Sequence, residues 1–329
     1  MRKLYVLLML PVLVVLVHGY AAVPAAHAAD NGNWSVYPAS PPRSAGETPT
    51  EPGRRPYFYL SADPGTTLTD QVTVTNKTAA PRTFRLYAAD AYNTERDGGF
   101  AVRARSEKQR GVGAWATLDR ERVTVPANSS VTVPYTLAVP EGAEPGDHPG
   151  AVVALDERVR PSTGSVAVGI QQAVGARVYL RVGGPTVPAL SVENVELTHQ
   201  QPLVPGTGES SALISYTLHN RGNVTLNPKV ALKAEGLFGR DLLSRELTKI
   251  PSELLPRQKI RLTERWSGAP RLEWGEVRLT ASARDVRESA GASFFALPWL
   301  VAVVLAAALA GAGVWARLRL RRPGVLRGA

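Results

Sequence analysis

Two short stretches of the chain, TDQVTVTN at residues 69–76 and SVTVPYTL at residues 130–137, alternate apolar and polar side chains. Side chains of a β-strand point alternately to its two faces, so this period of two places the apolar residues on one face. Turn-forming residues bound both stretches, as is typical of half-buried strands. The pattern recurs up to about residue 293, and no segment in between has convincing helical periodicity. The sequence therefore predicts an all-β exported region.

An internal repeat indicates how these strands are organised. An alternating stretch leads to Asn76 and a turn in the first half, and another leads to Asn220 and a turn in the second half. Later in each half a proline-containing segment, at 125–129 and at 255–259, opens a further strand. Two copies of one strand order predict two tandem immunoglobulin-like antiparallel β-sandwich domains. The Gly- and Pro-rich residues 183–188 mark the expected boundary between them.

Apolar segments at the two ends predict export and membrane anchoring. Arg2 and Lys3 precede an apolar run and the small-residue site Ala26-His27-Ala28, the pattern of a cleaved signal peptide. The uncharged run 294–316 is long enough to cross a bilayer, which takes about 20 residues as a helix. Five arginines and no acidic residue follow this run, so the C-terminus is expected in the cytoplasm. The predicted product is a single-pass type I membrane protein whose ectodomain is extracellular and faces the cell wall.

These signals divide the chain into six expected segments. They are a signal peptide at 1–28, a first β-sandwich at 29–184, a second β-sandwich at 185–285, a linker at 286–293, a transmembrane helix at 294–316 and a basic cytoplasmic tail at 317–329.

The charge and the absence of cysteine exclude several classes of function. The net charge of +10 comes largely from the two N-terminal residues and the five C-terminal arginines, so the exported part is only mildly basic. This distribution is not that of a nucleic-acid-binding surface. The chain has no cysteine. Disulfides, a cysteine nucleophile and a thiolate metal site are therefore excluded.

Several ordered motifs carry a resemblance to a known family. They are WSVYPASPP at 34–42, RPYFYLSADPGTTLTDQVTVTN at 55–76, DAYNTERDGGF at 90–100, VTVPANSSVTVPYTLAVP at 123–140 and PGDHPGAVVA at 145–154. In this order, over roughly residues 33–156, they resemble the peptidoglycan-binding domain of the WxL-interacting proteins. The resemblance implies that the first domain binds peptidoglycan or another wall polymer. It implies that the second domain binds a secreted surface protein or serves as a spacer. The Arg-, Ala- and Val-rich composition is typical of a Gram-positive bacterium with a GC-rich genome.

The candidate ligand-binding residues lie mainly in a long connection, residues 90–118, which exceeds its counterpart in the second half. Sugar rings stack on aromatic faces, and arginine pairs with carboxylates. The residues of these types are Tyr92, Asn93, Arg96, Arg103 and Trp115, with Trp34 from the opening segment. A structural interpretation stays open beside this one, in which Trp115 fills the core and the arginines form a solvated surface. Tyr57-Phe58-Tyr59-Leu60 is expected to be strand and core.

The sequence offers no recognisable catalytic or metal site. After signal removal only His148, His199 and His219 remain as imidazoles, and no GxSxG, HExxH or phosphate-binding glycine loop is present. Residues 93–98 imitate the opening of a calcium-binding EF-hand loop, but its twelfth position is Ala104, which has no carboxylate. We therefore expect neither catalysis nor a cofactor or metal.

The segment PGDHPG at 145–150 places an acid and an imidazole side by side. Its prolines and glycines favour a tight connection between two strands. In this interpretation Asp147 bonds backbone N–H groups of its own turn and His148 shields it. The alternative is that this segment contributes to the rim of a ligand-binding site.

Taken together, the sequence predicts a non-catalytic, membrane-anchored cell-surface protein that binds the cell wall through its first domain. The alternative is a chaperone-like or assembly β-sandwich protein at the cell surface, which lends or accepts a strand. A wall hydrolase is disfavoured because no catalytic constellation is present, and a purely structural stalk also remains open.

Overall fold

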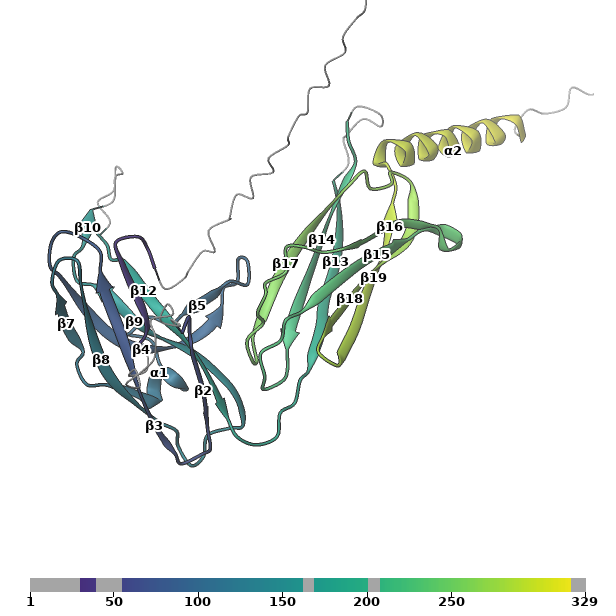
Figure 1. Cartoon of the computed structure of the whole chain (residues 1–329). Coiled ribbons are helices and arrows are strands. Elements are labelled where there is room, and N and C mark those ends of the chain that lie inside the picture. The colour runs from purple at the N-terminus through teal and green to yellow at the C-terminus, as the bar shows by residue number, and fades with distance from the viewer. Residues whose placement is uncertain (1–29, 40–54, 162–168, 201–207, 321–329) are drawn as a thin grey trace, which may run out of the picture.

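The computed structural model describes residues 30–39, 55–161, 169–200 and 208–320 of the 329-residue chain. In these ranges the chain forms two β-sandwiches followed by a helix, α2 (Trp299–Leu320) (Figure 1). The predicted fold class, two tandem immunoglobulin-like sandwiches and one C-terminal apolar helix, is confirmed. The predicted signal peptide at 1–28 and residues 321–329 of the basic tail lie outside the described residues.

The first sandwich is built from two sheets and a short helix, α1 (Val112–Trp115). One sheet has the order β1 (Trp34–Pro38), β3 (Thr67–Asn76), β8 (Ser129–Ala138), β6 (Ala116–Leu118). The other has the order β2 (Phe58–Ala62), β12 (Ala173–Val182), β9 (Gly146–Asp156), β4 (Arg82–Asn93), with β5 (Phe100–Val102) and β7 (Arg122–Val125) both paired to β4. Strands β10 (Arg160–Pro161) and β11 (Gly169–Ile170) form a small separate ladder. All pairs are antiparallel except β2 with β12, which is parallel.

The core of this sandwich follows the predicted alternation. Val72 and Val74 of β3 are fully buried, and Val72 lies opposite the buried Val133 of β8. Trp34 is also fully buried, with its ring centroid 5.4 Å from that of Phe84. Burying an aliphatic or aromatic side chain contributes about 1.5–3 kcal/mol. Alternating burial along paired strands therefore supplies the stability that disulfides provide in many exported domains.

The second sandwich also consists of two sheets, with seven strands in the residues that the structure describes. One sheet has the order β13 (Leu190–Gln200), β14 (Ser211–Asn220), β17 (Lys259–Ser267). The other has the order β16 (Asp241–Glu246), β15 (Lys229–Glu235), β18 (Glu273–Ala283), β19 (Val286–Ala296). A single turn of 3₁₀ helix, η1 (Leu237–Gly239), forms the tip of the β15–β16 hairpin.

The internal repeat is visible in two buried asparagines at the same place in the two sandwiches. The Asn76 Nδ2 donates to the carbonyls of Ala80 and Val125, and its Oδ1 accepts the N–H of Thr78. The Asn220 Nδ2 donates to the carbonyls of Val224 and Leu254, and its Oδ1 accepts the N–H of Gly222. Both side chains are fully buried. Each amide fixes the turn after its strand and ties that turn to a distant loop.

The predicted linker at 286–293 and the predicted start of the membrane helix at 294 are wrong. Strand β19 pairs with β18 along its whole length, and Phe294 is only 5% exposed in the core. Helix α2 begins at Trp299, after Pro298, and continues past residue 316 to Leu320. The uncharged run combines the end of a strand with a helix, which composition alone does not distinguish. Residues 300–319 are long and apolar enough to cross a bilayer as a helix.

Candidate ligand-binding site between the two domains

The segment 145–150 contacts the second domain, and β9 begins within it at Gly146. The Asp147 carboxylate accepts the N–H of Thr225 at 2.7 Å, and the Asp147 N–H donates to the Asn223 carbonyl at 2.7 Å. The same carboxylate accepts the Arg181 Nε at 2.7 Å. The expectation that Asp147 bonds its own turn is therefore wrong. A local sequence pattern does not reveal that another domain supplies the N–H group.

Gly146 makes this contact sterically possible. Its φ of +119° is one that other residues rarely adopt. A Cβ atom at this position would also lie 2.2 Å from the Asn223 carbonyl oxygen. Only glycine fits both the backbone conformation and the close approach of the second domain.

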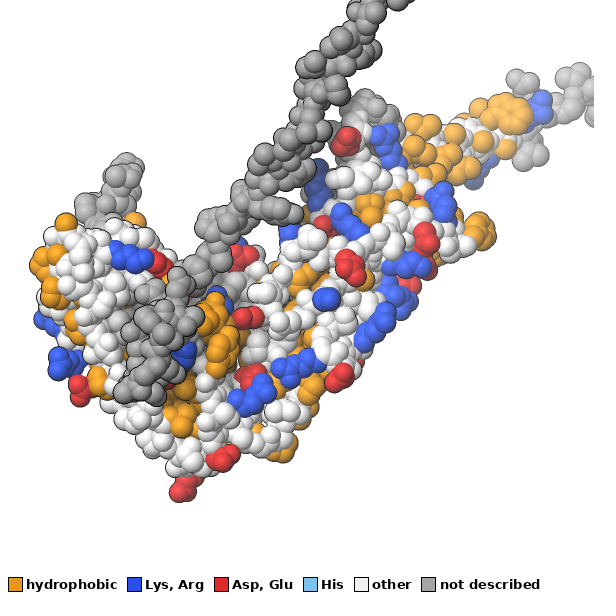
Figure 2. Space-filling view, viewed as in Figure 1, with side chains coloured by type: hydrophobic (Ala, Val, Ile, Leu, Met, Phe, Trp, Pro, Cys, Tyr) orange, Lys and Arg blue, Asp and Glu red, His pale blue; other side chains and the backbone are white. Residues whose placement is uncertain are grey.

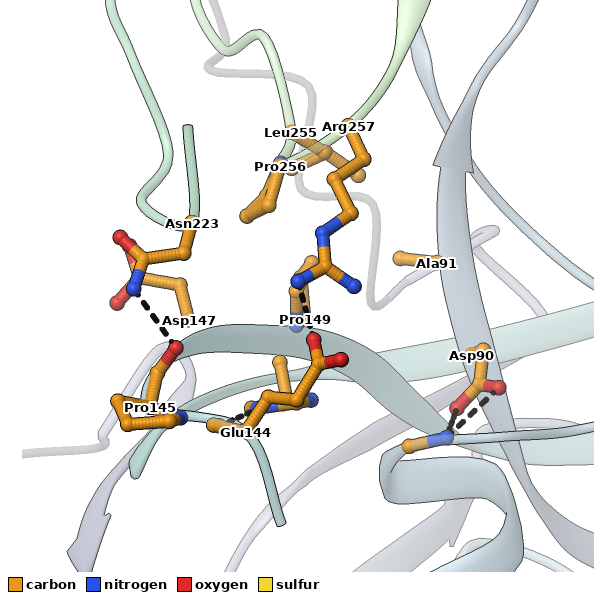
Figure 3. Close-up of a pocket in the computed structure, with 12 residues that line it drawn as sticks. Asp90, Ala91, Glu144, Pro145, Asp147, Pro149, Asn223, Leu255, Pro256 and Arg257 are labelled. Carbon is orange, nitrogen blue, oxygen red and sulfur yellow. Dashed lines mark hydrogen bonds and ion pairs between the residues drawn. The ribbon is translucent and has the colours of Figure 1, made fainter. Parts of the chain in front are cut away.

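A cleft of about 150 Å³ lies beside this contact, between the domains. An ion pair between Glu144 and Arg257 spans the cleft, and the Asn223 Nδ2 donates to the Pro145 carbonyl at 2.8 Å (Figure 3). Its lining residues come from both domains: Asp90, Ala91, Gly111, Glu144, Pro145, Asp147, His148, Pro149, Asn223, Leu255, Pro256 and Arg257. Glu144, Pro145 and Asp147 of the first domain thus bond residues of the second domain at this cleft. We interpret the cleft as the seam of an interdomain contact.

His148 lines the cleft and contacts a backbone carbonyl and an aromatic ring of the first domain. Its Nε2 lies 2.8 Å from the Glu144 carbonyl oxygen, and its ring centroid lies 4.7 Å from that of Trp115. Within the described ranges, no three His, Asp or Glu side chains are grouped so that they could hold a metal ion. The position of His148 agrees with a packing role.

Asn93, a predicted ligand residue, is buried in the interdomain contact. Its Nδ2 donates to the carbonyls of Gly98 at 2.7 Å and Glu253 at 2.8 Å. Its Oδ1 accepts the N–H of Leu255 at 2.8 Å. The side chain is 3% exposed. All of its strong hydrogen-bonding groups are engaged by protein, so it does not reach a ligand.

The outer face of β12 adds a second set of contacts between the domains. The Tyr179 hydroxyl donates to the Glu253 carboxylate at 2.9 Å and accepts an N–H of Arg177 at 3.0 Å. The Arg177 guanidinium lies 4.2 Å from the centroid of the Phe100 ring. Burial, together with the Glu253 charge, raises the pKa of Tyr179 against the opposing effect of Arg177. The tyrosine hydroxyl therefore keeps its proton and donates a hydrogen bond to Glu253.

Next to Tyr179 lies an open groove of about 430 Å³, here called the tyrosine groove. It is lined by Tyr59, Leu60, Ser61, Asp147, Pro149, Tyr179, Leu180, Arg181 and Thr225. The Tyr59 ring is 67% exposed and stacks on Tyr179, with centroids 5.3 Å apart and an interplanar angle of 12°. This volume lies within the range typical of small-molecule sites. The groove combines an exposed aromatic surface with a few charged and hydroxyl groups.

The structure places the other predicted ligand residues apart from this groove. Trp34, expected as a ligand residue, is fully buried in the core, and Trp115 is half-buried against the core, as in its structural interpretation. The Arg103 guanidinium lies over the Tyr92 ring, 5.8 Å from the centroid of that ring, and Arg103 also pairs with Glu107. Arg96 is exposed in the turn between β4 and β5. Of the six, Arg96 and Arg103 are exposed, and Tyr92 and Trp115 are partly exposed.

The long connection at 90–118 is held to the first domain by the pairing of β5 with β4 and of β6 with β8, and by the Asp90 carboxylate. Asp90 accepts the N–H groups of Arg110, Gly111 and Gly113, the last at 2.8 Å. The Gln109 Oε1 accepts the Asp90 N–H at 2.7 Å in return. The connection is therefore an ordered part of the domain, and its Asn93 end carries the contact to the second domain.

Sequence reasoning missed Tyr59, Tyr179 and Arg181 as candidate site residues. The signal was available in Tyr57-Phe58-Tyr59. Period-two alternation requires that Phe58 and Tyr59 face opposite sides, and Phe58 is the fully buried one. Assigning the whole stretch to the core overlooked this alternation. The pairing of β2 with β12, which brings Tyr59 onto Tyr179, joins residues about 120 positions apart and has no local signal.

No family model matches the chain, and no curated protein matches it. Solved structures of similar fold include a chaperone–tip adhesin complex of CFA/I fimbriae, with 12% identity, covering 80% of this chain and 98% of that chain, at a TM-score of 0.36. The class 5 fimbriae chaperone CfaA has 12% identity, covers 74% and 96% respectively, and has a TM-score of 0.32. The CupB2 chaperone of Pseudomonas aeruginosa has 9% identity, covers 72% and 97%, and has a TM-score of 0.27. These similarities concern the fold alone.

Proposed function

We propose that this chain is a non-catalytic, membrane-anchored cell-surface protein whose first domain binds peptidoglycan or another wall polymer in the tyrosine groove. The observation that carries the proposal is the exposed Tyr59 ring, stacked on Tyr179 at the edge of an open groove that also contains Arg181. The ligand class comes from the family resemblance of residues 33–156.

The groups in the groove suit a glycan that carries peptide or lactyl substituents. The apolar faces of sugar rings pack on aromatic rings, and Tyr59 offers such a face to solvent. Arg181 pairs with Asp147 but retains further N–H donors that suit a carboxylate or an amide carbonyl. Ser61 adds a hydroxyl on the same strand as Tyr59. Binding of this kind uses few strong contacts and is expected to be weak for a single site.

Anchoring compensates for weak binding. Helix α2 is long and apolar enough to cross a bilayer, and Arg317 and Arg319 lie in its last turn. Positive residues favour the cytoplasmic side, which leaves both sandwiches outside the cell. Tethering near the wall raises the effective concentration of the groove relative to its ligand. We assign the second domain the role of a spacer held to the first, with a surface-protein partner as its alternative role.

Sedimentation with purified cell wall tests this proposal. The full chain in lipid nanodiscs is expected to co-sediment with the wall, and Tyr59→Ala is expected to weaken binding roughly three- to tenfold, since aromatic contacts contribute about 0.5–1.5 kcal/mol. Ile170→Ala is the control, because Ile170 is 50% exposed in the first domain but does not line the tyrosine groove. Equal binding by Tyr59→Ala and the unchanged chain would contradict the groove assignment. Capture of a strand-donating protein without wall binding would favour the assembly alternative.

A further inference from the structure

The second domain exposes a contiguous apolar surface at the end from which helix α2 leaves. Trp274 of β18 and Phe295 of β19 lie opposite each other in the ladder, and each is 62% exposed. Leu272 and Leu297 are exposed two residues away on the same two chain segments. Directly opposed residues of an antiparallel pair project from the same face, so these side chains are neighbours. Large apolar side chains grouped in this way indicate an interaction surface.

The tip of the β15–β16 hairpin adds two more apolar side chains to this end. Leu237 is 52% exposed and Phe238 is fully exposed. Phe238 has a φ of +59°, in the left-handed region that a bulky residue rarely adopts. Because the Phe238 side chain is fully exposed, burial of its ring within the domain does not offset the energetic cost of this backbone conformation. Backbone strain of this kind is concentrated at functional positions.

A buried carboxylate fixes this tip beside the apolar pair. Glu273, next to Trp274 in β18, is 5% exposed. It accepts the N–H of Leu237 at 3.0 Å and forms an ion pair with Arg240. The hairpin tip is therefore held against the start of β18. Figure 2 shows hydrophobic side chains standing out at the hairpin tip, on the side of the domain where helix α2 leaves.

We propose that this end of the second domain inserts into the outer interface of the lipid bilayer. The membrane-contact surface consists of Leu237, Phe238, Leu272, Trp274, Phe295 and Leu297. The inference rests on the membrane anchoring of the proposed function. It adds that the second domain has a fixed orientation on the membrane. The end that carries the membrane-contact surface faces the lipid, and the β18–β19 turn at Arg284 and Asp285 points away from it.

Chain continuity identifies lipid as the occupant of this surface. Helix α2 begins at Trp299, four residues after Phe295 in the chain, so a helix that spans the bilayer brings Phe295 and Leu297 to the lipid headgroups. Tryptophan is favoured at this depth, because its apolar ring is buried while its N–H stays hydrated, and phenylalanine and leucine gain from burial of their apolar surface. The surface is mainly apolar, so its insertion is expected to persist at high salt, unlike an electrostatic attachment.

Fluorophores attached at single cysteines test the contact, because the natural chain contains no cysteine. An environment-sensitive label at Leu237→Cys is followed in the full chain, reconstituted in phosphatidylcholine vesicles with a quencher on the lipid acyl chains. A label at Trp315→Cys, inside α2, reports on membrane spanning. A label at Asp285→Cys, at the opposite end of β19, is the negative control. The proposal predicts quenching at positions 237 and 315 and none at position 285.

A second variant tests whether the aromatic residues cause the contact. Phe238→Ser with Trp274→Ser, in the Leu237→Cys background, is expected to abolish quenching at position 237 and to leave position 315 unchanged. Quenching at 315 without quenching at 237 would overturn the contact while leaving the anchor intact. An absence of quenching at both would refute both proposals. Quenching at position 237 that survives the double substitution would also overturn the proposal. So would a blue shift of the label at 237 without quenching by lipid, because that result would indicate that a second copy of the chain covers this surface.

Discussion

Asp147 of the first domain and Thr225 of the second are joined by a hydrogen bond of 2.7 Å from the Thr225 N–H to the carboxylate. Because Asp147 also holds Arg181, one side chain connects the tyrosine groove to the interdomain contact. Asn93 and Tyr179 add further contacts to residues 253 and 255 of the second domain. The two sandwiches are therefore coupled through hydrogen bonds at several separate positions.

Replacing Asp147 tests the coupling directly. Asp147→Ala leaves the Thr225 N–H without its acceptor, and an unsatisfied donor costs about 1–3 kcal/mol. We expect the free energy of unfolding, measured with urea, to fall by this amount. Asp119→Ala is the control, since Asp119 is exposed and pairs only loosely with Arg120 at 3.6 Å; its effect should stay within about 0.5 kcal/mol. Equal effects of the two substitutions would contradict the assigned role of Asp147.

Substituting Gly146 should separate the unfolding of the two domains. Alanine at this position meets the Asn223 carbonyl and adopts a disfavoured φ, which together cost at least about 2 kcal/mol. We expect Gly146→Ala to broaden the calorimetric transition or to split it in two. Gly142→Ala serves as the comparison, because a Cβ there meets nothing within 4 Å. A single, unshifted transition in Gly146→Ala would show that the interdomain contact is not formed in solution.

Tyr179→Phe separates the two roles of that residue. The change removes the hydroxyl between Arg177 and Glu253 but retains the ring under Tyr59. Loss of a hydrogen bond to a charged group costs about 1.5–3 kcal/mol when buried, and somewhat less in this half-buried setting. We expect lower stability in urea and unchanged co-sedimentation with the wall. Weakened wall binding with unchanged stability would reverse the assignment of the two roles.

His199 should make stability depend on pH. Burial lowers the pKa of His199 below its ordinary value of 6.5, and neither ring nitrogen has a hydrogen-bond partner among the described residues. Below pH 6.5 the unfolded chain binds a proton that the folded chain does not, so stability falls as the pH falls. Above that pH the histidine contributes no pH dependence.

The measurement compares the unchanged chain with His199→Phe, in which the ring can still pack against Phe294. Urea unfolding on both sides of pH 6.5 is expected to show a smaller acid-induced loss of stability in His199→Phe. Other groups titrate equally in both proteins, so the difference isolates His199. Identical pH profiles would contradict the prediction.

Local periodicity accounts for what the sequence could predict. Alternation at Val72 and Val74 predicts a half-buried strand because side-chain direction is set by the strand itself. The same rule, applied strictly, would have predicted that Tyr59 is exposed and that Phe294 is buried while Phe295 is exposed. It could not have placed Asn93 or Asp147, because their partners belong to another domain and lie 78 to 162 residues away. Contacts of that kind depend on the packing of complete domains.

The two buried asparagines show where the two sandwiches differ in length. The side-chain amide of Asn76 donates to a loop carbonyl 49 residues later in the chain, whereas that of Asn220 donates to one only 34 residues later. The longer stretch in the first sandwich contains Asn93, which bonds the second sandwich at Leu255. The segment that makes the two sandwiches unequal is thus a segment that joins them.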